Sequence, residues 1–159
     1  MATRHTLHRV QTVRAPLDEV FAFFADAGNL ERITPPFLRF RYLTELPIEM
    51  RVGARILYRI ALFGVPMKWL TEIAAYEPPR RFVDRQERGP YAVWIHTHEF
   101  ESVPEGTRLV DRVEYELPFG PLGGLAHALW VRRTLERIFD FRHVYIASRF
   151  GAVAPSKAH

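Results

Sequence analysis

The most regular pattern of hydrophobic and polar positions lies between residues 92 and 117, where apolar side chains recur at every second position in two consecutive runs. In an extended strand, positions i, i+2 and i+4 share one face. One face of each run therefore carries these residues: Trp94, His96, His98 and Phe100 in the first, and Leu109, Asp111, Val113, Tyr115 and Leu117 in the second. Because buried polar groups need hydrogen-bond partners or solvent, a face that mixes apolar groups with imidazoles and a carboxylate is typical of a cavity wall.

The same patterns predict the other elements of the fold. Period-two alternation predicts strands over residues 5–14, 38–45, 54–63, 66–76, 81–87, 92–103 and 107–117. Helical spacing of apolar residues predicts a helix that begins near Ala15-Pro16, a second short helix over 29–33 and one long helix over 125–150. We therefore expect an α+β fold, in which a curved antiparallel sheet of about seven strands, two short helices and one long C-terminal helix enclose a cavity. Residues 1–152 are expected to form a single ligand-binding domain, and residues 153–159 a flexible tail.

Composition narrows the classes of function. The chain contains no cysteine, which excludes disulfides and thiolate metal sites. Its first residues lack the apolar stretch of a signal peptide, and no apolar run approaches the roughly 20 residues of a membrane span, so we expect a cytoplasmic protein without integral membrane association. The net charge is +4, but the arginines are spread along the chain and alternate with apolar residues, so no nucleic-acid partner is expected.

Several short motifs, in this order of elements, resemble a known superfamily. The similarity is carried by residues 15–21, 29–36, 82–86, 89–91, 94–100 and 111–115. They resemble the SRPBCC superfamily of helix-grip proteins, which includes START and birch-pollen-allergen-like domains, and in particular its small bacterial polyketide cyclase/dehydrase-like branch. The resemblance implies a ligand-binding cavity between the sheet and the long helix. It implies no particular reaction, because carriers, regulators and enzymes share this scaffold.

The two histidines of the 92–103 strand permit three interpretations. Two imidazoles two residues apart on a strand, with Asp84 or Asp111 as a third ligand, have the spacing of a zinc or iron site. His96 or His98 could instead act as a general acid or base that an aspartate orients, with Asp111 across the hairpin as a candidate. The third interpretation is a hydrogen-bonded polar patch that shapes the cavity. An HxH pair alone is a weak metal signal, and we therefore expect no metal and no cofactor.

Arg142 lies in the middle of the apolar face predicted for the long helix, together with Val131, Leu135, Ile138, Tyr145 and Ile146. An arginine in that position must pair with a carboxylate, reach solvent or contact a ligand. Alternation also places Asp84 and Gln86 on the inward face of their strand. The ligand-binding residues that the sequence predicts are Tyr58, Trp69, Asp84, Gln86, Trp94, His96, His98, Asp111, Tyr115 and Arg142.

These observations favour a protein that binds a small, largely hydrophobic ligand, such as a lipid, an isoprenoid or an aromatic polyketide-like compound. A first alternative is a cyclase, dehydratase or hydrolase that uses His–Asp acid–base chemistry in the same cavity. A second alternative is a regulatory or interaction module without a functional cavity. The sequence leaves the oligomeric state open.

Overall fold

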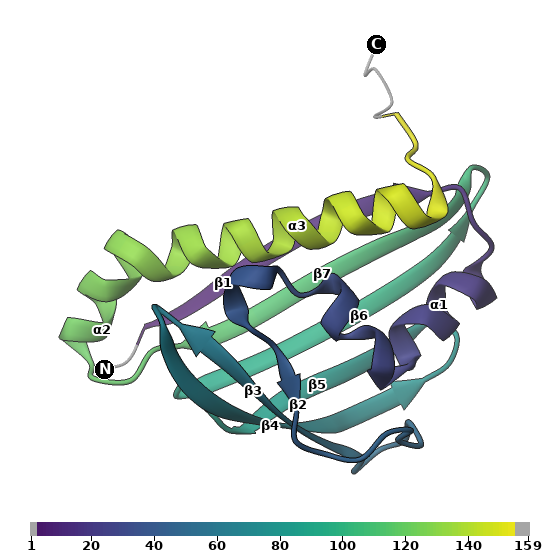
Figure 1. The fold of residues 1–159 in the computed structure, drawn as a ribbon. Helices are drawn as coiled ribbons and strands as arrows, with labels where there is room; N and C mark the ends of the chain where they lie inside the picture. The colour runs from purple at the N-terminus through teal and green to yellow at the C-terminus, as the bar shows by residue number, and fades with distance from the viewer. Residues whose placement is uncertain (1–2, 155–159) are drawn as a thin grey trace.

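Alternating runs along the chain form one antiparallel sheet in the computed structural model, which describes residues 3–154 (Figure 1). The strands within this range are β1 (Arg4–Val13), β2 (Arg41–Tyr42), β3 (Arg55–Leu62), β4 (Val65–Glu77), β5 (Arg81–Arg88), β6 (Val93–Val103) and β7 (Gly106–Glu116). They follow the spatial order β1-β7-β6-β5-β4-β3-β2. The expected α+β helix-grip fold, with a curved sheet of seven strands in the part of the chain that is described, is confirmed.

One predicted strand is much shorter than expected. Of residues 38–45, only Arg41–Tyr42 form a strand beside β3, and the N–H of Leu43 adds one more hydrogen bond to Leu57. Before them Pro36–Leu38 form a 3-10 turn, and Arg39 adopts a left-handed φ of 48°. Proline without a backbone donor and a residue outside the extended region both interrupt a strand, so the alternation around residue 40 does not extend into the ladder. The predicted tail of residues 153–159 lies mostly outside the described residues, because the description ends at residue 154.

The long C-terminal helix lies across the concave face of the sheet (Figure 1). It begins earlier than predicted, with α2 (Pro121–Ala126), passes through one π-helical turn, η4 (His127–Val131), and continues as α3 (Arg132–Phe150). Near the start of the chain, α1 (Leu17–Ala25) is followed by three 3-10 turns: η1 (Ala27–Asn29), η2 (Glu31–Ile33) and η3 (Pro36–Leu38). None of the helices in residues 3–154 has the length and apolar character that crossing a bilayer requires.

The face that α3 buries is rotated from the predicted one. Its buried residues are Leu135, Phe139, Arg142, Ile146 and Phe150, which follow one another at spacings of three or four. Ile138 and Tyr145, predicted on the buried face, are only partly buried at its margin. Arg142 is nevertheless on the buried face, because it belongs to both the predicted and the observed stripe of the helix.

Two apolar clusters fill the space between the sheet and the helices. One surrounds α1 and includes Phe82 and Phe100, and the other lies toward α2 and includes Trp69, Trp94 and Phe139. Along β6, His96 and His98 come between Trp94 of one cluster and Phe100 of the other. Along α3, Arg142 likewise lies between Phe139 and Ile146. A polar layer therefore separates two apolar halves of the core.

Gly106, which follows the β6–β7 turn, lies against the end of β1, and a substitution there tests how tightly the two segments pack. Its φ is +145°, and a Cβ atom there would lie 2.1 Å from the carbonyl oxygen of Val13. We expect Gly106→Ala to lower the free energy of unfolding by about 2 kcal/mol or more, because the backbone of β1 must move. Gly64 has a φ of +78°, but a methyl group added there would meet nothing within 4 Å, so Gly64→Ala should cost only about 1 kcal/mol. Urea denaturation measures both, and equal losses would contradict the steric explanation.

Candidate functional site

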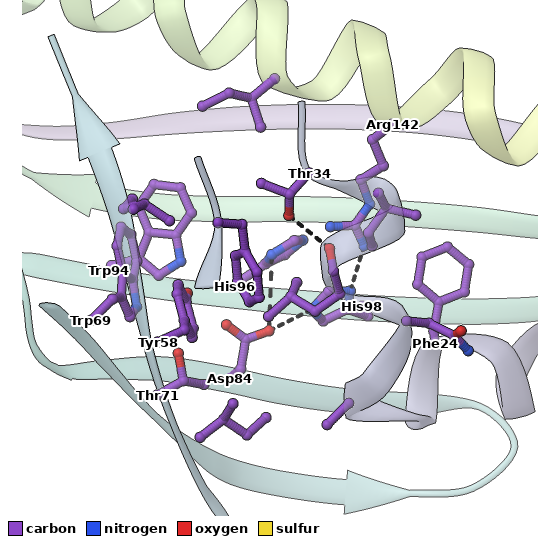
Figure 2. A pocket seen from close by; sticks show the side chains of 18 of the residues that line it. Phe24, Thr34, Tyr58, Trp69, Thr71, Asp84, Trp94, His96, His98 and Arg142 are labelled. Carbon is purple, nitrogen blue, oxygen red and sulfur yellow. Dashed lines mark hydrogen bonds and ion pairs between the residues drawn. The ribbon is translucent and has the colours of Figure 1, made fainter. Parts of the chain in front are cut away.

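Five polar residues from three adjacent strands and the long helix meet inside the fold, and Figure 2 shows four of them: Asp84, His96, His98 and Arg142. Asp84 comes from β5, His96 and His98 from β6, Asp111 from β7 and Arg142 from α3. Strand register brings the first four together, because Asp84 is opposite His96 and Asp111 is opposite His98. Side chains at paired positions lie on the same face, so all four point toward the helix.

The hydrogen bonds connect diagonal neighbours rather than directly opposite ones. His96 donates through Nε2 to Oδ1 of Asp111 at 2.7 Å, and His98 donates through Nε2 to Oδ2 of Asp84 at 2.6 Å. The two imidazole rings stack with their centroids 3.7 Å apart. Each histidine thus bonds to the carboxylate opposite its neighbour, which links β5, β6 and β7 through one crossed network.

Arg142 connects this network to the helix. Its Nη2 atom lies 3.5 Å from Oδ1 of Asp111 and donates a hydrogen bond of 3.3 Å to Nδ1 of His98. With Nε2–H directed at Asp84, Nδ1 of His98 must carry a lone pair to accept from the guanidinium. Both nitrogens of His98 are therefore occupied in its neutral form.

The electrostatics agree with this assignment. Burial, together with the neighbouring charges of His96 and Arg142, lowers the pKa of His98 to about 4, although Asp84 opposes the shift. Burial alone would raise the pKa of Asp111, but Arg142 and the hydrogen bond from His96 outweigh it and hold that pKa well below its ordinary value. The pKa of Asp84 is also lowered, because the hydrogen bond from His98 and the nearby positive charges outweigh the effect of burial. Two carboxylates consequently stay ionised beside one guanidinium and two imidazoles.

His96 offers the cluster's available ring nitrogen. Its Nδ1 atom is 3.9 Å from Oδ2 of Asp84, which is too far for a hydrogen bond. Among the described residues it is the one nitrogen of the two imidazoles that no hydrogen bond occupies. An imidazole held through Nε2 by a carboxylate, with Nδ1 free, can accept a hydrogen bond or a proton from a bound molecule.

The cluster forms part of the wall of a cavity of about 160 Å³. Apolar side chains make up most of the remaining wall, from the 3-10 turns, from β3 and β4 and from α3. Figure 2 shows Tyr58, Trp69 and Trp94 at one side of the histidine pair and Arg142 with Phe24 at the other. An apolar cavity of roughly this volume accommodates a benzene-sized molecule.

Two buried donors on this wall have no hydrogen-bond partner among the described residues. They are Nε1 of Trp69 and Nε of Arg142. Both residues line the cavity, and Arg142 is only 9% exposed. Buried donors are nearly always paired, so an unpaired one on a cavity wall indicates a position where an acceptor atom is needed.

Seven of the ten predicted ligand-binding residues line the cavity: Tyr58, Trp69, Asp84, Trp94, His96, His98 and Arg142. Gln86 does not, because its side-chain amide bonds to the backbone of Tyr91 in both directions and holds the β5–β6 turn. Asp111 lies behind His96, where it orients the ring. Tyr115 is buried in the core, and its hydroxyl lies 2.6 Å from Nε2 of His127, near the start of the long helix.

The structure adds residues that the sequence analysis did not select. Thr71 is buried on β4, two positions beyond Trp69, and Phe139 lies one helical turn before Arg142; both line the cavity. Strand parity with Trp69 could have identified Thr71. The 3-10 turns and their flanks contribute Asn29 and Thr34, for which the sequence offers no periodic signal.

Three of the polar residues have an arrangement that a metal ion could use. Ligand atoms of Asp84, His96 and His98 lie within 4.8 Å of one another. A cation bound there would have to replace the 2.6 Å hydrogen bond between His98 and Asp84, and it would lie beside the positive charge of Arg142. The hydrogen-bonded network uses the same atoms without that repulsion, so these residues fit the network better than a metal site.

The low pKa of His98 predicts that acid destabilises the fold. In the unfolded chain His98 takes up a proton near pH 6.5, whereas in the folded protein its pKa is about 4. The unfolded state therefore binds more protons between these values, and the free energy of unfolding should fall as pH is lowered from 6.5 to 4, by up to about 3 kcal/mol. Urea titrations across this range measure the slope.

Replacing His98 separates its contribution to the pH dependence of stability from those of the other titratable groups. In His98→Gln the slope between pH 6.5 and 4 should be shallower by up to one proton, and the control His143→Gln, at an exposed position of α3, should keep the slope of the unsubstituted protein. An unchanged slope in His98→Gln would show that this histidine is not held neutral.

The sequence and the fold are both similar to those of known proteins. The sequence matches the family model described as polyketide cyclase / dehydrase and lipid transport over residues 4–146. No protein with a curated description matched the sequence.

Among solved structures, TTHA0849 from Thermus thermophilus is similar, with 18% identity, coverage of 92% of this chain and 99% of that one, and a TM-score of 0.66. CV1439 from Chromobacterium violaceum has 18% identity, coverage of 93% and 99%, and a TM-score of 0.69. The protein Ara h 8.0201 has 15% identity, coverage of 92% and 99%, and a TM-score of 0.61. Since the family model covers nearly all of the chain, the protein belongs to the polyketide cyclase/dehydrase and lipid transport family, within the SRPBCC helix-grip superfamily.

Proposed function

We propose that the protein binds a small, largely hydrophobic molecule that carries a neutral hydrogen-bond acceptor. Family membership supports hydrophobic ligand binding in general. The observation that carries the finer proposal is the pair of unpaired buried donors, Trp69 Nε1 and Arg142 Nε, on the wall of an otherwise mostly apolar cavity in the described part of the chain. A carbonyl or hydroxyl oxygen satisfies such donors, whereas a pure hydrocarbon leaves them buried without partners.

Charge and volume restrict the ligand further. Asp84 and Asp111 already outnumber the guanidinium of Arg142, so a ligand carboxylate would meet net repulsion unless an imidazole is protonated. The volume of about 160 Å³ fits one ring or a short branched chain. A ring-containing polyketide-like compound or an isoprenoid unit therefore fits the cavity better than a long acyl chain.

Acetophenone and ethylbenzene test this proposal as a matched pair, because they differ by a carbonyl in place of a methylene. We expect acetophenone to bind about tenfold more tightly, as one hydrogen bond to an otherwise unpaired buried donor contributes about 1 to 1.5 kcal/mol. Quenching of the fluorescence of Trp69 and Trp94 on the cavity wall, or chemical-shift changes in NMR, measures both affinities.

Variants identify the donor. Trp69→Phe keeps an aromatic ring but removes one N–H, so it should reduce the preference for acetophenone. The control is Trp130→Phe, which makes the same substitution at an exposed tryptophan that does not line the cavity. Equal affinity of the unsubstituted protein for the two compounds would overturn the proposal. An unchanged preference for acetophenone in both single variants, Trp69→Phe and Arg142→Met, would also overturn it.

The free Nδ1 atom of His96 specifically favours the enzymatic alternative. Asp111 holds Nε2–H at 2.7 Å, so a His96–Asp111 pair could take a proton from a substrate in the cavity and return it to a leaving hydroxyl, as cyclisation with loss of water requires. Asp111 is then a positioning residue, and His96 is the group that touches the substrate.

Native mass spectrometry of His96→Asn distinguishes an enzyme from a carrier. A carrier variant purified from the same host should contain the same compound as the unsubstituted protein, at lower occupancy. An enzyme variant should instead accumulate a substrate of different mass, heavier by one water for a dehydratase. An identical compound at undiminished occupancy would exclude any role of His96 in either function.

A further inference from the structure

Large apolar side chains are exposed at the end of the molecule that holds α2. Figure 1 shows where this end of the fold lies. They come from the β3–β4 turn and from the segment that leads into the long helix: Phe63, Val65, Phe119, Leu122, Leu125, Leu129 and Trp130. Phe119 is 81% exposed and Phe63 is 67% exposed. We call this set of residues the apolar end.

The two segments form one continuous surface. Phe63 lines a groove together with Leu129 and Trp130, and it also lines a second groove together with Phe119 and Leu122. An exposed apolar surface built from several large side chains marks an interaction site more often than an isolated exposed leucine does.

Backbone conformation gives a second, independent observation. Phe63 has a φ of 51° and Phe119 a φ of 72°, so both adopt the left-handed conformation. Glycine or asparagine is favoured there, and a bulky aromatic residue is unfavourable. At each phenylalanine, both the left-handed backbone conformation and the exposure of the apolar ring to water are thus unfavourable. A contact outside the chain would compensate for both effects.

Charge indicates which kind of partner fits. Residues 56–71 and 117–135, which contain the apolar end, include no aspartate or glutamate. Their cations are Arg59, Lys68, Arg133 and Arg132, and the last of these pairs with Glu136. Arg133 and Arg137 line the groove that Phe63 and Trp130 share. A second copy of this chain would bring arginines against arginines, whereas anionic headgroups above an apolar phase match both features.

We propose that the apolar end docks on the surface of an anionic lipid bilayer. Phe63, Phe119 and Leu122 enter the boundary between headgroups and acyl chains, and Arg133 and Arg137 contact lipid phosphates. Trp130, an amphipathic ring, lies at the same level. The protein binds peripherally and does not span the membrane.

The docked surface is next to the ligand cavity. Leu62 and Tyr91 line both the cavity and the groove beside Phe119. A hydrophobic ligand held in the bilayer would thus be separated from the cavity by these two side chains. Docking itself does not depend on the proposed ligand, so each proposal can fail alone.

Tryptophan emission reports docking directly. The chain has three tryptophans, of which Trp69 and Trp94 are buried and Trp130 is 57% exposed. Vesicles of phosphatidylcholine with phosphatidylglycerol should shift the emission of Trp130 to shorter wavelength and should sediment with the protein. Vesicles of phosphatidylcholine alone should do so about tenfold more weakly, and added salt should weaken binding to the anionic vesicles. In Trp130→Phe the emission shift should disappear.

Paired variants locate the surface. Phe119→Ser with Leu122→Ser should weaken sedimentation with anionic vesicles by at least about tenfold, because two apolar side chains that enter the bilayer are lost. Arg133→Glu with Arg137→Glu should remove the preference for anionic lipid. Val144→Ser is the control, since Val144 is also exposed but lies on the outer face of α3. All these positions are exposed, so thermal unfolding should show folded proteins.

Three results would overturn docking on a bilayer. The first is no binding of the unsubstituted protein to anionic vesicles. The second is equal loss in Val144→Ser and in the Phe119/Leu122 variant. The third is a dimer in sedimentation velocity that the Phe119/Leu122 variant dissociates without any change in vesicle binding, which would assign the surface to a second copy. Retention of acetophenone binding in the docking variants would keep the cavity proposal separate from this one.

Discussion

The pairing of Arg142 is the constraint on which the rest of the structure depends. A guanidinium on the buried face of α3 is tolerated only if it is neutralised and hydrogen-bonded where it lies. Asp111 and His98 meet that requirement from β7 and β6, and the crossed bonds to His96 and Asp84 extend it to β5. The rotation of the helix and the register of three strands are thereby fixed together, since a shift of one residue in any strand would turn its polar member to the opposite face.

The sequence predicts this fold well where burial alternates. β6 and β7 begin and end within about one residue of the predicted strands, because each has one face in the core and one in water. The crossed pairing of histidines and carboxylates could not be predicted, since it depends on side-chain direction across a register that alternation does not determine. The predicted helix face is rotated from the observed one, because Ile138 and Tyr145, like the buried Phe139 and Phe150, have large apolar or aromatic side chains.

Alternation along a strand predicts which residues face inward, but near the strand ends it does not predict which of them reach the cavity. Gln86 and Tyr115 are on the predicted faces, but the cavity does not extend to either of them. Near Gln86 the chain turns back so that Tyr91 occupies the amide, and above Tyr115 lies His127. Face is a local property of a strand, whereas the extent of a cavity depends on what the distant helix covers.

Two regions of the long helix have different roles. Its later part holds Arg142 in the polar network, and its first turns carry the exposed apolar residues and one π-helical turn, His127–Val131. At 1.5 Å per residue, the two regions are about 20 Å apart along the axis. The same separation lets the polar network stabilise a fold whose other end exposes apolar groups that favour contact with a partner over contact with water.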